Sequence, residues 1–224
     1  MTLAMPGAVT PEAMLAHLGS RRSVRAFTPA AVARDVLERL VAAAITAPSA
    51  GNRQLWRFVV VTRPATRAQI AGAVRAATEA IDGAVRRGPH ANEWGSYGDQ
   101  FWQPLAAAAA IIVPAVREPP DLLAGLLRSA GADPARFQLP SAMQPERCAL
   151  GGAVMALLLQ AHAEGLGAAW MAGPMVARAE LEAACGIAAP WQMAGAIAVG
   201  YPATVPAAPS RKSPDDVVTW LEEG

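Results

Sequence analysis

Three arginines and a serine lie together near the start of the chain, in the run Arg21, Arg22, Ser23, Val24 and Arg25. In an extended backbone alternate side chains point to the same side, so Arg21, Ser23 and Arg25 would face one partner. Guanidinium groups donate paired hydrogen bonds to phosphate oxygens, and a serine hydroxyl adds a further donor. The run therefore predicts a site for a phosphate or another polyanion, with a solvated basic turn as the alternative.

A second candidate is segment 47–56, APSAGNRQLW, which joins an expected helix to an expected strand. Gly51 permits close approach of the backbone. The side-chain amides of Asn52 and Gln54 each offer a donor and an acceptor, which suits the edge of a planar heterocycle. A plain connecting turn needs neither these amides nor Trp56, so the segment predicts contacts to a flat polar ligand.

A third candidate is segment 165–174, GLGAAWMAGP, in which small residues open onto an expected strand edge. Backbone amides near Ala172 and Gly173 would be accessible to a ligand there. A fourth is the basic pair Arg211 and Lys212, which lies on a proline-rich tail. Such a tail is stiff and extended, and it can reach another subunit.

Composition and missing motifs narrow the possible functions. The net charge is +1, so the chain lacks the broad positive field that nucleic-acid binding needs. Phosphate-loop, dinucleotide-fold, zinc-protease and serine-hydrolase motifs do not occur. His17, His90 and His162 are scattered, and Cys148 and Cys185 form no metal-ligand pattern, so no metal site is expected.

The compartment and the partners follow from the same composition. Two unpaired cysteines suit a reducing compartment, and neither a signal peptide nor a membrane-spanning run is evident, which favours a cytoplasmic protein without membrane contact. Hydrophobic residues make up 53% of the chain and charged residues 17%. This thinly charged surface indicates a partner subunit.

Apolar periodicity predicts one α+β domain over residues 1–224, with helices outnumbering strands and a βαβ-like order. Helices are expected at residues 10–19, 31–47, 64–87, 122–129, 147–164, 178–185 and 215–221. Strands are expected at residues 56–62, 109–116, 168–171 and 195–199, with a loop at 88–98. The helix at 147–164 is apolar almost throughout, so it should run through the centre of the fold.

Taken in order, these segments resemble the FMN-dependent nitroreductase family. Its members carry an RRSxR motif, an APSxxNxQxW turn, a GLG segment before a strand, and a C-terminal basic residue after a Gly-Tyr-Pro-like stretch, here Gly200-Tyr201-Pro202. The resemblance extends from about His17 to Trp220. It implies a nitroreductase-like fold with a central mixed sheet surrounded by helices. It also implies a homodimer with two FMN molecules at the subunit interface and a C-terminal extension that reaches the partner.

The resemblance also implies a set of cofactor-binding residues. The phosphate and ribityl chain would be bound by Arg21, Arg22, Ser23, Arg211 and Lys212. The pyrimidine ring would be bound by Arg25, Asn52 and Gln54, and the flavin N5 would lie beside the backbone amides of Ala172 and Gly173. Positive charge near the pyrimidine stabilises the anionic reduced flavin and so raises its potential.

Substrate contacts are expected from an aromatic group, Trp94, Tyr97, Phe101 and Trp102, which either packs internally or forms a wall over the flavin. The family pattern also has one departure here. Some members carry Pro-x-Glu-Gly-Phe beside the flavin N5, whereas this chain has Trp-Met-Ala-Gly-Pro at residues 170–174. The substrates of those members therefore cannot be assumed.

By resemblance, the function is an FMN-dependent oxidoreductase. It would take hydride from NADH or NADPH and reduce a flat acceptor, a nitroaromatic or a quinone, by a ping-pong mechanism, with no side chain required as a catalytic acid or base. One alternative is a biosynthetic flavoenzyme of the same superfamily, of the dimethylbenzimidazole-synthase type or one that oxidises modified peptides. Another is an FMN-binding protein without turnover.

Overall fold

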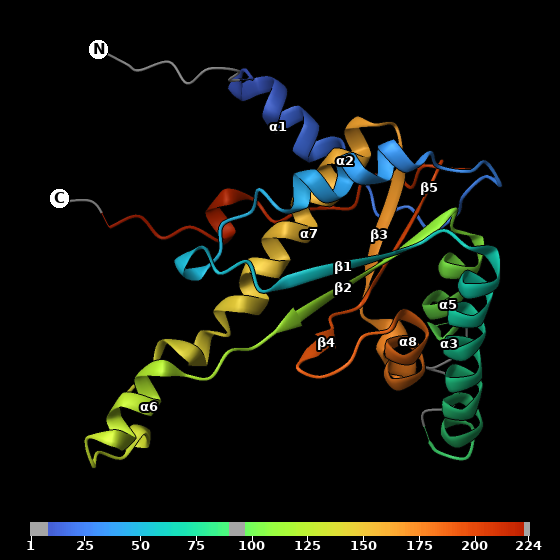
Figure 1. Ribbon diagram of the computed structural model, residues 1–224. Helices are drawn as coiled ribbons and strands as arrows, with labels where there is room; N and C mark the ends of the chain where they lie inside the picture. Colours follow the sequence, from blue (N-terminus) through green and yellow to red (C-terminus); the bar gives the residue numbers. More distant parts are fainter. Residues whose placement is uncertain (1–8, 90–96, 222–224) are drawn as a thin grey trace.

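A five-stranded sheet forms the centre of the computed structural model, which describes residues 9–89 and 97–221. The strands lie in the order β1 (Trp56–Val61), β2 (Ala110–Arg117), β5 (Ala196–Gly200) and β3 (Gly167–Met171), and β4 (Trp191–Met193) pairs with β2 (Figure 1). These pairings are all antiparallel. Because β2 and β5 are buried on both faces, their sequences are continuously apolar rather than alternating.

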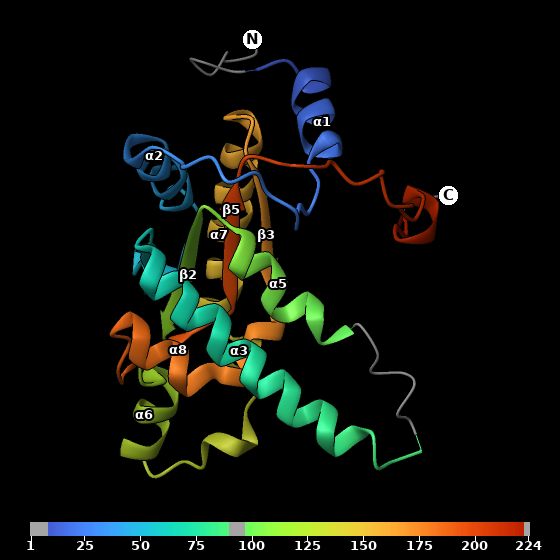
Figure 2. The ribbon, with the colours of Figure 1, turned by 90° about the vertical axis from the view of Figure 1, so that its right-hand side faces the viewer.

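Helices cover both faces of this sheet. On one face lie α2 (Arg34–Ala44) and α7 (Pro145–Ala163). On the other lie α3 (Pro64–Val85), α5 (Asp99–Ala107) and α8 (Arg178–Cys185), which stand in front of the sheet in Figure 2. The apolar residues between the layers form two buried clusters. As expected, α7 runs through the centre, because it packs against α2 as well as the sheet.

Most expected elements are present with ends that shift by a few residues, and the α+β class is confirmed. Thr10 caps α1 (Pro11–Ser20) by accepting a hydrogen bond from the amide of Ala13 at 3.2 Å. Helix α2 begins at Arg34 rather than near Ala31. Helix α5 and strand β4 had no counterpart among the expected elements.

Helices separate β1, β2 and β3 along the chain, as expected, but these strands do not pair in the parallel manner of a βαβ unit. Helices α3 and α5 pack against each other between β1 and β2, so the chain re-enters the sheet at the end where it left. Strand β2 therefore runs antiparallel to β1. A mixed sheet would also contain parallel strand pairs. Among the described residues, parallel pairing is limited to an isolated bridge between Ser23 and Ala168.

Three segments project from the layered core. They are α1, the excursion with α6 (Leu122–Ser129) and the short 3-10 turns Pro134–Arg136 and Pro140–Met143, and the tail after Gly200 (Figure 1). The expected helix at 215–221 is instead a single 3-10 turn, Pro214–Asp216. Trp220 is 75% exposed, so no packing surface of the same chain stabilises so short a helix.

Candidate functional site

The Arg21–Arg25 run is extended and lies beside β3. Val24 is buried, and its amide donates to the carbonyl of Ala168 at 3.2 Å. Gly167 makes this approach possible, because a Cβ there would lie 2.6 Å from the Val24 side chain. With Val24 facing the core, the side chains of Ser23 and Arg25 point outward, as the alternation predicts.

The C-terminal tail returns to this run because it pairs with the residues that follow it. The amide of Thr28 donates to the carbonyl of Tyr201 at 2.8 Å, and the amide of Ala203 donates to the carbonyl of Ala26 at 3.0 Å. From there the tail passes the arginines. The two segments enclose a cavity of about 300 Å³, the arginine cavity, which is lined by Arg21, Arg22, Ser23, Arg25, Pro206, Ala207, Pro209 and Arg211.

The arginine cavity is strongly electropositive, since its lining residues include guanidinium groups and no carboxylate. The Nε atom of Arg21 is buried and has no hydrogen-bond partner. Arg22 is oriented differently, because its Nη1 donates to the carbonyls of Gly19 at 2.6 Å and Arg21 at 3.0 Å. Its guanidinium therefore also stabilises the C-terminal end of α1.

A pair of histidines behind the cavity joins α1 to α7. Ser20 Oγ lies 2.7 Å from His162 Nε2, and His17 Nε2 lies 3.1 Å from the carbonyl of Leu159. Desolvation lowers the pKa of His162, and the charges of His17, Arg21 and Arg22 lower it further. The positive potential of the arginine run thus extends to α7. Sequence reasoning missed this contact, since the two histidines are far apart in the chain.

Asn52 and Gln54 lie together in an exposed turn between α2 and β1. Gln54 Nε2 donates to Asn52 Oδ1 at 3.1 Å, and the Gln54 amide donates to Ser49 Oγ at 3.0 Å. The loop between α2 and β1, which contains this turn, lies at the opposite end of α2 from the segment that follows the Arg21–Arg25 run (Figure 1). One copy of the chain therefore does not bring the amide pair to the arginine cavity.

Ala172 and Gly173 follow directly after β3, at the start of the 3-10 turn Gly173–Ala177. Gly173 is in close contact with Phe101, since a Cβ at Gly173 would lie 2.3 Å from Cδ1 of that ring. Any larger residue at 173 would therefore require the Phe101 ring to move. The Phe101 ring of α5 thus lies beside the segment whose backbone amides are expected to face a ligand.

The aromatic group is only partly brought together. Tyr97 and Phe101 form an edge-to-face pair with ring centroids 5.0 Å apart. Trp102 faces α3 instead, where Arg75 lies over its ring, and its Nε1 donates to Asp99 Oδ1 within α5 itself at 3.2 Å. Trp94 lies outside the described residues. Lys212 is exposed and does not line the arginine cavity, whereas its neighbour Arg211 does.

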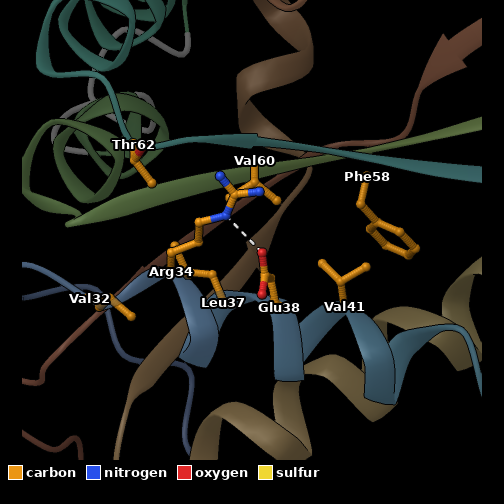
Figure 3. A pocket seen from close by; sticks show the side chains of 8 residues that line it. All are labelled: Val32, Arg34, Leu37, Glu38, Val41, Phe58, Val60 and Thr62. Carbon is orange, nitrogen blue, oxygen red and sulfur yellow. Dashed lines mark hydrogen bonds and ion pairs between the residues drawn. The ribbon is translucent and has the colours of Figure 1, made fainter.

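A larger cavity, of about 580 Å³, lies elsewhere, between α2 and the outer edge of β1 (Figure 3). Val32, Leu37, Val41, Phe58 and Val60 give it an apolar lining, and Arg34 and Glu38, both on the α2 side, form an ion pair at 2.7 Å. None of the predicted cofactor residues lines it. We call it the α2–β1 groove.

Comparison with known proteins decides the family. The Nitroreductase family model matches residues 18–201. This chain belongs to the nitroreductase family. An iodotyrosine deiodinase from Haliscomenobacter hydrossis is 32% identical over 124 residues, which are 50% of this chain and 54% of that protein. A 5,6-dimethylbenzimidazole synthase from Rhodobacter capsulatus is 38% identical over 73 residues, 33% of this chain and 35% of that protein. The chain thus matches only about half or less of the length of these curated relatives.

Solved structures of the nitroreductase family share the fold. A BluB-like flavoprotein from Clostridium difficile superposes with a TM-score of 0.82 at 22% identity, covering 93% of this chain and 99% of that one. A Desulfovibrio desulfuricans protein described as a nitroreductase, in complex with FMN, has a TM-score of 0.65 at 26% identity, covering 97% and 99%. The family model thus gives the family of this chain, and these structures give its fold.

The described part of the chain also bears on membranes and metals. No helix within residues 9–89 and 97–221 has the length and apolar character to cross a membrane. Within the same residues, no three His, Cys, Asp or Glu side chains gather as a metal site would need.

Proposed function

We propose that this protein is an FMN-dependent oxidoreductase that binds the cofactor phosphate in the arginine cavity. The observation that carries the proposal is the convergence of Arg21, Ser23 and Arg25 with Arg211, from opposite ends of the chain, on one cavity without a carboxylate. The buried, unpartnered Nε of Arg21 is a donor that a phosphate oxygen would satisfy. These features fit a phosphate group, and a family neighbour was solved with FMN.

When bound, the flavin would supply hydride transfer from NADH or NADPH to a flat acceptor, a nitroaromatic or a quinone. The chain's own residues would bind and orient it. Arg21, Ser23 and Arg211 would hold the phosphate end, with Lys212 beside them and Arg22 contributing through the backbone. The Ala172 and Gly173 amides would lie along the ring system. No side chain needs to act as an acid or base.

Asn52 and Gln54 would bind the pyrimidine edge, with Arg25 close by. In the described pairing, Asn52 Nδ2 is left as a donor and Gln54 Oε1 as an acceptor, which complement the alternating groups of a pyrimidine. Because this turn and the arginine cavity lie apart in one chain, one flavin can contact both only across two copies. We therefore propose a homodimer with FMN at its interface.

The tail of one copy would dock in the α2–β1 groove of the other. Strand β1 is at the edge of the sheet, with apolar side chains exposed beside it in Figure 3. The tail carries the complementary apolar residues: Val217, Val218 and Trp220 are 65%, 41% and 75% exposed in the single chain. If each tail docked in the groove of the other copy, the apolar surfaces of both tail and groove would be buried, which favours an exchange of tails between two copies.

The acceptor would bind against aromatic side chains of α5 and the segment before it. Phe101 is the best placed, because it contacts Gly173 directly. Tyr97 packs against Phe101 and is 55% exposed, so it could extend the same wall. Trp94 and Trp102 remain further candidates for this role.

A second candidate is a biosynthetic flavoenzyme, favoured by the 38% identity to a 5,6-dimethylbenzimidazole synthase. Anaerobic mixing of the purified holoprotein with NADH, and separately with NADPH, distinguishes the candidates. The proposed oxidoreductase should lose its flavin absorbance within seconds with one of them and regain it when a quinone is added. A flavin that stays oxidised with both nucleotides would exclude the proposed reaction, and a purified protein without FMN that does not bind added FMN would exclude the cofactor.

A further inference from the structure

Two residues of the Asn52 turn hold a backbone conformation that side chains disfavour. Asn52 and Gln54 have φ angles of 52° and 48°, in the left-handed region, and they flank Arg53, whose φ is −72°. Asparagine tolerates this region better than glutamine does. Such strain persists only where surrounding contacts impose it, and it concentrates at functional positions.

The contacts that impose this conformation come from Ser49 and Arg53. The Asn52 amide donates to the Ser49 carbonyl at 2.9 Å, and the Gln54 amide donates to Ser49 Oγ at 3.0 Å. Arg53 Nε donates to the Ala50 carbonyl at 3.2 Å, and its Nη2 forms an ion pair with Glu146 Oε1. Arg53 is therefore the side chain that connects the turn to another element.

Glu146 is the more buried partner of this ion pair. It lies in the first turn of α7, where the helix dipole favours a negative charge. Its side chain is only 10% exposed, whereas that of Arg53 is 45% exposed. A carboxylate so withdrawn from water needs a cationic partner, and Arg53 is the cation paired with it. Since α7 packs against α2 and the sheet, the ion pair ties the exposed turn to a helix of the core.

We propose that Arg53 and Glu146 are positioning residues for the cofactor. Their ion pair holds the strained turn so that Asn52 Nδ2 and Gln54 Oε1 are presented together, in fixed geometry, to the pyrimidine edge of FMN. This inference rests on the proposed function. Neither residue needs to touch the cofactor, because each acts through the conformation of residues 50–54.

The test is a double-mutant cycle on FMN binding, with Arg53→Gln, Glu146→Gln and the double variant. Apoprotein is titrated with FMN, and the visible absorption spectrum and reduction potential of the bound flavin are recorded. Arg147→Gln is the matched control, because it breaks a neighbouring ion pair on α7, that of Arg147 Nε with Glu118 Oε1 at 2.7 Å, away from the turn. Arg53→Lys keeps the charge but loses the bond from Nε to Ala50.

Each single variant should raise the Kd for FMN by about tenfold, and the double variant should have the same Kd as the single variants. The spectrum and the reduction potential of the bound flavin should shift together. Arg53→Lys should recover part of the affinity, and Arg147→Gln should match the wild type. Thermal unfolding of each apoprotein separates positioning from folding. The inference is overturned if Arg53→Gln and Glu146→Gln bind FMN with wild-type affinity and spectrum, or if affinity falls only in proportion to stability. Failure of the wild-type protein itself to bind FMN would instead refute the proposed function.

Discussion

Replacing Arg21 by alanine should weaken FMN binding more than replacing Arg211. Both residues line the arginine cavity, but Arg21 is half-buried with a buried Nε, whereas Arg211 is exposed. A hydrogen bond to a charged group contributes about 1.5 to 3 kcal/mol, which corresponds to an increase in Kd of roughly 10- to 150-fold. Arg21→Ala should lie near the upper end of this range. Arg211→Ala should lie near the lower end, because water and salt screen an exposed guanidinium.

The assay is the quenching of FMN fluorescence by the apoprotein, at two ionic strengths and with riboflavin in parallel. Riboflavin lacks the phosphate, so both variants should bind it like the wild type. Higher salt should reduce the effect of Arg211→Ala more than that of Arg21→Ala. Arg86→Ala removes an exposed arginine at the end of α3, where it pairs with Asp82 away from the arginine cavity, and serves as the control. Unchanged FMN affinity in both cavity variants, or an equal loss of riboflavin affinity, would refute the assignment of the arginine cavity to the phosphate.

Three further predictions concern assembly, kinetics and pH. The protein should migrate as a dimer, near twice 23.2 kDa, even when dilute, and deletion of residues 202–224 should reduce both dimer stability and FMN content. A stable monomer saturated with FMN would contradict the proposed interface. Initial-rate plots against NAD(P)H and a quinone should be parallel, and intersecting lines would exclude a shared face of the flavin. Desolvation and neighbouring cations lower the pKa of His162 in the folded protein, so the unfolded chain binds this proton more readily, and the melting temperature should fall as the pH drops below about 6.5. His162→Asn should weaken this pH dependence, and a variant whose melting temperature follows pH as the wild type's does would contradict the assignment to His162.

Residue types and spacing alone pointed to the segments that we propose bind the cofactor. Alternation in the run from Arg21 to Arg25 predicted which side chains share a side, because an extended backbone permits only that arrangement. The side-chain amides of Asn52 and Gln54 predicted a planar partner, because each offers a donor and an acceptor. Strands β2 and β5 and the central helix α7 were also predictable, since continuous apolar sequence is stable only when it is buried.

The tertiary structure decided which of these segments meet. Arg211 joins the arginine cavity because the tail pairs with residues 26–28, a contact across most of the chain that no local pattern encodes. The Asn52 turn remains apart, so two halves of one expected site lie on different faces of a single chain. Strand direction was likewise beyond local reasoning, because it depends on how α3 and α5 pack against each other. Local sequence determines which groups a segment can offer, whereas long-range packing determines which groups one ligand can contact.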